Sequence, residues 1–205
     1  PLETLFPYTT LFRSLEGRDT EQNQLLLAFP GITYGSGERP AMAIMNTILG
    51  GSASSRLYTR LRDELGLCYD LESFDMTYAD TGLVGIGAAT SAGNEQRALR
   101  EITDGLRRFL DEGPSDSELA RAKAQAESGA VIALESTLAR MRRMGQSELF
   151  LGRVDSIDEV VERYNAVTRE DVLDFARRTF DFSRLSVAAL GKVRAREEYE
   201  ALRLL

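Results

Sequence analysis

The stretch Gly50–Tyr69, which reads GGSASSRLYTRLRDELGLCY, decides the fold of this chain. Its two opening glycines let the backbone bend, and the hydroxyls of Ser52, Ser54 and Ser55 can then cap the N-terminus of a helix. A further glycine, sixteen residues after the first, can take the left-handed conformation that ends a helix. The stretch therefore predicts a helix that begins after the serines and turns back into a strand.

One face of this helix is predicted to be buried, because leucines recur every four residues at Leu57, Leu61 and Leu65. Gly66 follows at the position where a left-handed residue is wanted. Leu67 can then fold back on Leu61, which is the contact that accompanies such a helix end. The chain therefore reverses here, and we expect residues on the two sides of the reversal to meet at one corner.

The pattern GGxxSSRLxxxLRxxxGLxY in this stretch resembles the C-terminal half-domain of the M16 (pitrilysin or insulinase-like) zinc metallopeptidases. It is most similar to the subfamily that contains mitochondrial processing peptidase and its bacterial relatives, and the resemblance covers roughly Asp19 to Lys192. In this family an arginine and a tyrosine at this spacing reach from the C-terminal half to a peptide bound at a zinc site in the N-terminal half. The resemblance implies that Arg62 and Tyr69 bind the peptide and stabilise the transition state. It also implies that Gly50, Gly51, Ser54 and Ser55 help to bind the peptide.

The absence of histidine limits what this chain can do alone. A catalytic zinc takes three protein ligands, commonly histidines with a carboxylate, and the family's inverted signature is H-x-x-E-H. None of the 205 residues is a histidine, and Glu127 and Glu135 suit a solvated helix face better than a zinc site. We therefore predict that this chain holds no metal or other cofactor and is inactive alone. The resemblance places the zinc in an N-terminal half or a second subunit.

Composition and charge fit a soluble globular domain, with 43% hydrophobic and 28% charged residues. The net charge of -7 argues against nucleic acid as a partner, because phosphate binding needs a basic surface. No apolar run approaches the roughly 20 residues that span a bilayer, so we expect no membrane segment. The single Cys68 rules out an internal disulfide and is predicted to be a small buried side chain. The compartment stays open, with the cytoplasm favoured over the periplasm.

The N-terminal residues 1–14 are predicted to be an artefact. Thr4–Ser14, which reads TLFPYTTLFRS, looks like the translation of a common sequencing-adapter oligonucleotide, and such segments are excluded from fold reasoning. This interpretation implies a reading frame that is truncated at the front, with an upstream half missing from the record. We expect residues 15–205 to form a single domain of the M16 C-terminal type.

Along the rest of the chain, apolar patterns and turn residues predict strands followed by helices and a closing strand. The predicted strands are 22–29, 67–78, 83–90 and 185–190, and the predicted helices begin at Pro40, Asn94, Ser115, Ser156 and Thr168. The helix from Ser115 is expected to continue to about Met144. This order favours the α+β class, with an antiparallel sheet covered by helices, as in a processing-peptidase-like metallohydrolase half-domain.

Three functions remain open at this point. The first is the substrate-binding half of a zinc metalloendopeptidase, the second a non-catalytic M16-like scaffold subunit, and the third an α+β ligand-binding module. The presence of both Arg62 and Tyr69 favours the first, because a scaffold has no chemical need for the pair. We expect both side chains to lie partly buried on a concave, polar face that takes a peptide substrate.

Overall fold

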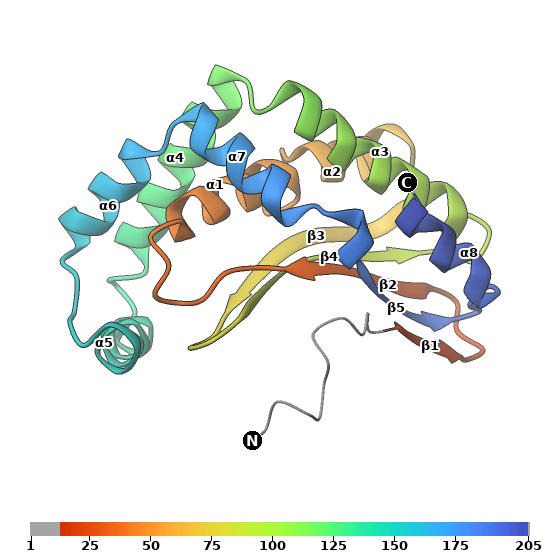
Figure 1. The fold of residues 1–205 in the computed structure, drawn as a ribbon, viewed down its shortest axis with the longest axis horizontal. Coiled ribbons are helices and arrows are strands. Elements are labelled where there is room, and N and C mark those ends of the chain that lie inside the picture. Colours follow the sequence, from red (N-terminus) through yellow and green to blue (C-terminus); the bar gives the residue numbers. More distant parts are fainter. Residues whose placement is uncertain (1–12, 205) are drawn as a thin grey trace.

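The computed structural model describes residues 13–204, which form a five-stranded sheet with helices on one of its faces (Figure 1). The strands are β1 (Arg13–Gly17), β2 (Asn23–Pro30), β3 (Cys68–Thr77), β4 (Gly82–Thr90) and β5 (Ser186–Gly191). The helices are α1 (Arg39–Leu49), α2 (Arg56–Tyr58), α3 (Glu95–Glu112), α4 (Asp116–Ile132), α5 (Thr137–Leu151), α6 (Ile157–Ala166), α7 (Arg169–Thr179) and α8 (Arg196–Glu200). A π-helical turn, Thr59–Glu64, continues α2, and short 3-10 turns span Phe182–Arg184 and Ala201–Leu204.

The sheet is mixed rather than antiparallel throughout, with the strand order β1-β5-β2-β4-β3. Three of its four pairings are antiparallel, as predicted, but β1 runs parallel to β5. Arg13 and Ser14 begin β1 and pair with Val187 and Ala188, although both belong to the N-terminal segment that we predict to be an artefact. The rest of that segment, residues 1–12, lies outside the described residues. The α+β class is confirmed, and the antiparallel description is corrected at this edge.

The core lies between the sheet and the helices above it (Figure 1). Along β2 the side chains of Leu25, Leu27 and Phe29 are buried, whereas the alternate residues face the side without helices. Helix α1 completes this layer with Ile44 and the other apolar residues at helical spacing. Among the described residues, no helix is both long and apolar enough to cross a membrane.

The long helix predicted from Ser115 is broken in two. Helix α4 ends at Ile132, and α5 begins at Thr137. Ser136 causes the new start, because its backbone is extended and its hydroxyl accepts a hydrogen bond from the backbone N–H of Ala139 at 3.2 Å. The capping box that Ser115 and Glu118 predict is present at the start of α4.

A buried polar cluster joins the sheet to α3 and α8. The side-chain amide of Asn23 donates to the Glu95 carboxylate and, at 3.1 Å, to the carbonyl of Lys192, while its oxygen accepts the Lys192 N–H at 2.7 Å. The Tyr199 hydroxyl donates to the other oxygen of Glu95. Asn23 and Glu95 are both 0% exposed, so these bonds are what allows a carboxylate to be buried here.

Candidate functional site

The corner predicted around Gly66 is present in the structure. Gly66 has a φ of +58°, and the backbone N–H of Leu67 donates to the carbonyl of Leu61 at 2.8 Å. This bond spans six residues and closes the helix end in the predicted way. Leu57 and Leu61 are buried, and Leu65 is partly buried against the core. The predicted burial of this helix face and the predicted reversal are both confirmed.

The helix that leads into this corner is irregular. After the α-helical residues of α2 it widens into the π-helical turn Thr59–Glu64, in which Leu65 donates to the carbonyl of Arg60 five residues earlier at 3.2 Å. Such single π-turns occur frequently at functional sites. Arg62 lies inside this turn.

The serines before the helix do not cap it. Ser55 occupies the capping position, but its hydroxyl makes no capping hydrogen bond and is buried without a partner among the described residues. Ser52 instead donates to the carbonyl of Thr47 at 3.4 Å. The prediction that serine hydroxyls cap this helix is therefore wrong.

The predicted substrate-binding serines lie in a different place from Arg62 and Tyr69. They line a hollow of about 430 Å³ that also includes residues of α2, the π-turn and α3. The lining residues are Ser54, Ser55, Arg56, Leu57, Thr59, Arg60, Glu64, Gly105, Arg108 and Glu112. Since neither Arg62 nor Tyr69 belongs to this lining, the serines and the arginine–tyrosine pair do not share one cavity.

The glycine pair has a packing role. A Cβ on Gly50 would lie 2.7 Å from the backbone nitrogen of Ser73, whose N–H donates to the Gly50 carbonyl at 3.2 Å. A Cβ on Gly51 would lie 3.1 Å from the carbonyl oxygen of Asn46. Glycine at Gly50 therefore lets the end of α1 pack directly on β3. A role for Gly50 and Gly51 in binding a peptide stays a prediction.

Arg62 and Tyr69 are both exposed. The guanidinium of Arg62 donates a hydrogen bond to the hydroxyl of Tyr58 and lies 4.9 Å from the centre of its ring. Tyr69 is 72% exposed, so the partial burial expected for it is wrong. Among the described residues, no hydrogen bond or ring contact joins Arg62 to Tyr69.

A β-bulge presents Tyr69 to solvent. On the edge strand β3, Cys68 pairs with Thr90 and Asp70 pairs with Ala89, which leaves Tyr69 as the extra residue. Bulges bend a strand and re-aim a side chain, and they are frequent at sheet edges and beside active sites. Both predicted residues therefore sit in local irregularities, one in a π-turn and the other in a bulge.

The other arginines of this helix are tied to carboxylates. Arg56 donates to both oxygens of Glu118 at 2.6 and 2.8 Å and to the carbonyl of Gly113 at 2.9 Å. Arg60 donates to Glu64 at 2.9 Å and to Glu101 at 3.1 Å. These ion pairs fasten the helix to α3 and α4.

The Arg56–Glu118 pair makes stability depend on pH. Its hydrogen bonds hold the pKa of Glu118 at about 2, below the usual 4.5, and bonds from Ser115 act in the same direction. A depressed pKa adds stability above the unfolded-state pKa, and this stability is lost as the pH falls from about 4.5 towards 2. We expect the free energy of unfolding of wild type to be about 2 kcal/mol higher than that of Glu118→Gln at pH 6. At pH 3 the difference should be much smaller. Urea unfolding at both pH values measures it. An equal difference at both pH values would contradict this assignment.

Cys68 is buried next to Tyr69, and this burial disfavours the reactive form of its thiol. Its burial raises the pKa of the thiol to about 11, so the reactive thiolate is scarce at neutral pH. The predicted role as a small buried side chain is confirmed.

The residues that the structure describes do not fit a catalytic zinc. The sequence has no histidine, and within residues 13–204 no three Asp, Glu or Cys side chains gather in a way that could hold a metal ion. The chemistry available at this corner is hydrogen-bond donation and positive charge from Arg62, together with the phenol of Tyr69.

Comparison with known sequences gives a family and two informative relatives. Residues 3–126 match the family described as the peptidase M16 inactive domain. A protein of Streptomyces coelicolor named an uncharacterized zinc protease is 36% identical over 183 residues, and one of Bacillus subtilis with the same description is 35% identical over 163 residues. These alignments cover 89% and 80% of this chain but 40% of each relative. The chain thus spans less than half the length of these relatives.

Solved structures show the same fold. The peptidase M16 inactive domain from Pseudomonas fluorescens aligns with a TM-score of 0.81 at 22% identity, over 91% of this chain and 45% of that one. A chain of complex III2 from Candida albicans aligns with a TM-score of 0.84 at 18% identity, over 95% of this chain and 49% of that one. The sequence match, the fold and the chain reversal at Gly66 all agree. This chain therefore belongs to the M16 peptidase family and corresponds to its C-terminal, inactive domain.

Proposed function

We propose that this chain is the substrate-binding half of an M16-type zinc metalloendopeptidase and is inactive alone. Its task is to present Arg62 and Tyr69 to a peptide bound on a second, zinc-bearing half. The observation that carries the proposal is the state of Arg62, which is exposed and bonded to a neutral phenol, whereas Arg56 and Arg60 on the same helix are bound to carboxylates. Its positive charge is therefore available to an outside group.

Each side chain has a simple chemical role in this proposal. Arg62 and Tyr69 donate hydrogen bonds to the peptide backbone or to the carbonyl oxygen that gains negative charge during cleavage. One such donor is typically worth about 2.7–4 kcal/mol of transition-state stabilisation. In this proposal the second half supplies the metal, because residues 13–204 do not fit a zinc site, and it supplies the general base as well.

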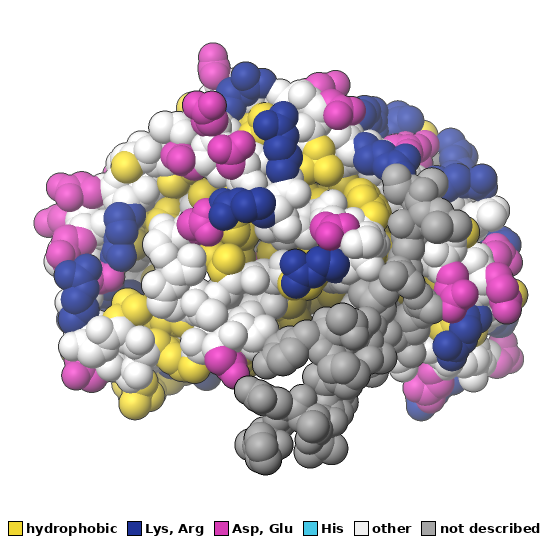
Figure 2. All heavy atoms as spheres, viewed as in Figure 1, with side chains coloured by type: hydrophobic (Ala, Val, Ile, Leu, Met, Phe, Trp, Pro, Cys, Tyr) yellow, Lys and Arg dark blue, Asp and Glu magenta, His cyan; other side chains and the backbone are white. Residues whose placement is uncertain are grey.

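Helix α5 supports the proposed pairing with a second half. It stands apart from the other helices in Figure 1, and apolar side chains gather over it at the lower left of Figure 2. Leu138, Met141 and Leu149 are 52%, 60% and 83% exposed, and their spacing puts them on one side of the helix. Exposed apolar side chains gathered on one helix face are typical of an interaction site.

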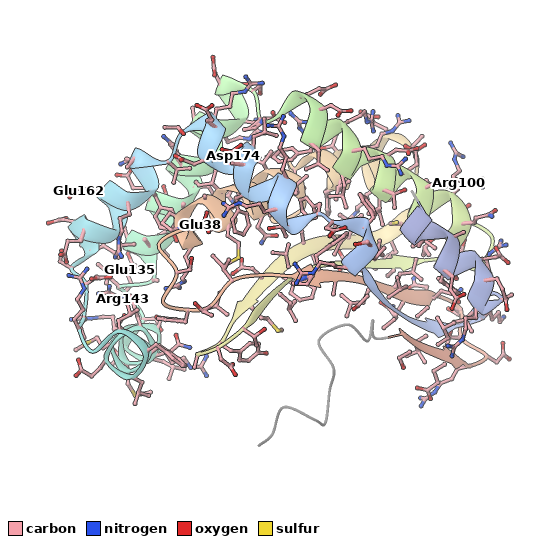
Figure 3. The ribbon with its side chains drawn as sticks, in the orientation of Figure 1. Glu38, Arg100, Glu135, Arg143, Glu162 and Asp174 are labelled. Atoms are coloured by element: carbon pink, nitrogen blue, oxygen red, sulfur yellow. The ribbon has the colours of Figure 1, made fainter. Side chains whose placement is uncertain are left out.

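The proposed partner is a second half-domain of similar size. The aligned relatives and solved chains extend beyond this chain by about its own length or more, which leaves room for such a half. The exposed stripe formed by Leu138, Met141 and Leu149 belongs to a helix that is fastened to the segment following it. Arg143 on α5, labelled in Figure 3, donates a hydrogen bond to the carbonyl of Asp155 at 2.9 Å. We infer that a second M16 half covers this stripe.

The proposal is tested with the chain alone and with a chimera. In the chimera, this chain replaces the matched segment of the Bacillus subtilis relative, so that the rest of that zinc protease supplies the second half. We expect the isolated chain to fold, hold no stoichiometric zinc and cleave no peptide. We expect the chimera to hold one zinc and cleave an unstructured peptide, as measured by metal analysis and mass spectrometry.

Two results would overturn the proposal. One is an isolated chain that holds a full equivalent of zinc or cleaves peptide. The other is a folded, zinc-loaded chimera whose cleavage rate is unchanged when Arg62→Ala and Tyr69→Phe are combined, because these residues would then have no part in the reaction.

A further inference from the structure

Tyr58 gives Arg62 a partner without a charge. The helix Arg56–Glu64 carries three arginines. Two of them, Arg56 and Arg60, form ion pairs with carboxylates. Within residues 13–204, Arg62 makes a hydrogen bond to the Tyr58 hydroxyl, and its guanidinium carbon lies 4.9 Å from the centre of the Tyr58 ring. A carboxylate at this place would cancel the charge of Arg62, whereas a phenol orients the guanidinium and leaves the charge intact.

Tyr58 itself is well placed to act as a support. Its ring is partly buried and packs against the hydrophobic core, next to the fully buried Leu57. An exposed arginine otherwise samples many rotamers, and restricting them to one direction costs conformational entropy. A side chain that is anchored in the core and contacts the guanidinium reduces this cost before a substrate arrives.

The π-turn contributes to the same arrangement. Tyr58 is the last residue of α2, and Arg62 lies within the π-helical turn that starts immediately after it. A π-turn has more residues per turn than an α-turn, so each side chain in it points in a different direction from the one an α-helix would give. Within this local geometry the guanidinium of Arg62 lies against the ring and hydroxyl of the residue four positions earlier, a spacing that also makes side chains neighbours on an α-helix.

We propose that Tyr58 is a positioning residue that holds the Arg62 guanidinium in one direction while leaving its positive charge for the substrate. The inference rests on the proposed function of Arg62, but the contact between the two side chains is testable in the isolated chain. Tyr58 touches no substrate in this proposal and acts only through Arg62.

The first test uses NMR spectroscopy of the isolated chain and does not depend on activity. The Tyr58 ring should shift the δ-proton signals of Arg62 upfield, and these signals are assigned by their loss in Arg62→Ala. We expect Tyr58→Leu to remove the shift and Tyr58→Phe to keep most of it, because the ring face remains. The signals of Arg60, which contacts Glu64 and Glu101, serve as the control and should not move. An Arg62 signal that is the same in wild type and Tyr58→Leu would overturn the inference.

The second test measures kcat and KM in the zinc-containing chimera. We expect Tyr58→Leu to lower kcat/KM about tenfold, mainly through kcat, which corresponds to about 1.4 kcal/mol of transition-state stabilisation. Tyr58→Phe should restore much of this loss. In an Arg62→Ala background, Tyr58→Leu should have no further effect, because a positioning residue has nothing left to position.

The outcomes separate the two proposals. If Arg62→Ala is as active as wild type, the proposed function of Arg62 fails, and the NMR result still decides whether Tyr58 holds it. If Arg62→Ala is slow but Tyr58→Leu is as active as wild type, Arg62 keeps its role and the inference about Tyr58 is wrong. A loss in Tyr58→Leu that simply adds to that of Arg62→Ala, or a lowered melting temperature in both backgrounds, would show a structural effect and also overturn it.

Discussion

Replacing Arg62 by alanine is expected to lower kcat of the zinc-containing chimera about 10²- to 10³-fold, with folding and zinc content unchanged. This is the effect of removing one donor that serves a developing negative charge. Folding should be unaffected, because Arg62 is exposed and its contacts are with Tyr58 on its own helix. Steady-state kinetics measures kcat, thermal unfolding checks that the variant is folded, and metal analysis checks its zinc content.

Arg60→Ala is the matched control for this experiment. Arg60 lies two residues earlier on the same helix and carries the same charge, but it is bound to Glu64 and Glu101. We expect this variant to keep kcat within a few-fold of wild type and to change the free energy of unfolding little, because exposed ion pairs contribute little to stability. Equal losses of kcat in both variants would mean that general charge near the site matters and that Arg62 has no specific role.

Asn23→Ala is expected to have the largest effect on stability, lowering the free energy of unfolding by about 3 kcal/mol. The substitution leaves one oxygen of the buried Glu95 carboxylate without its donor and also frees the N–H and carbonyl of Lys192. Buried groups that lose their partners keep the cost of desolvation and gain nothing in return. Urea unfolding of the isolated chain at neutral pH measures the change.

Gln24→Ala serves as the control on the same strand. Gln24 is the next residue of β2 and points to the opposite face, where it is exposed. We expect its substitution to change the free energy of unfolding by less than about 0.5 kcal/mol. If Asn23→Ala were equally mild, the Glu95 cluster would be hydrated and would not be a closed polar core.

Features with a local physical cause were predictable from the sequence. Gly66 follows a helix with a buried leucine face, and the left-handed turn forms there because glycine adopts a positive φ without strain. The alternation of Leu25, Leu27 and Phe29 likewise predicted a strand with one buried face. The spacing of Arg62 and Tyr69 pointed to the corner, and both residues proved to be exposed there.

Features that depend on tertiary contacts were missed. In the sequence Asn23 and Glu95 look like ordinary polar residues. Their burial depends on hydrogen bonds with Tyr199 and Lys192, which lie far away in the sequence. The π-turn and the bulge at Tyr69 have no marker such as proline or an inserted glycine. The break before α5 did have a local signal, the capping residue Ser136, which the continuous run of helix-forming residues obscured.

The order of strands in the sheet determines how the chain can fold. Strand β2 lies between β4 and β5, so Leu25 pairs with Ala88 on one side and with Ala189 on the other. The first pairing closes a loop of moderate length, but the second joins opposite ends of the described chain. Pairings of such long sequence separation form slowly, because loop-closure entropy must be overcome first. An edge of β2 therefore stays unpaired until the last strand arrives, and during that time the chain is exposed to misassembly with other copies.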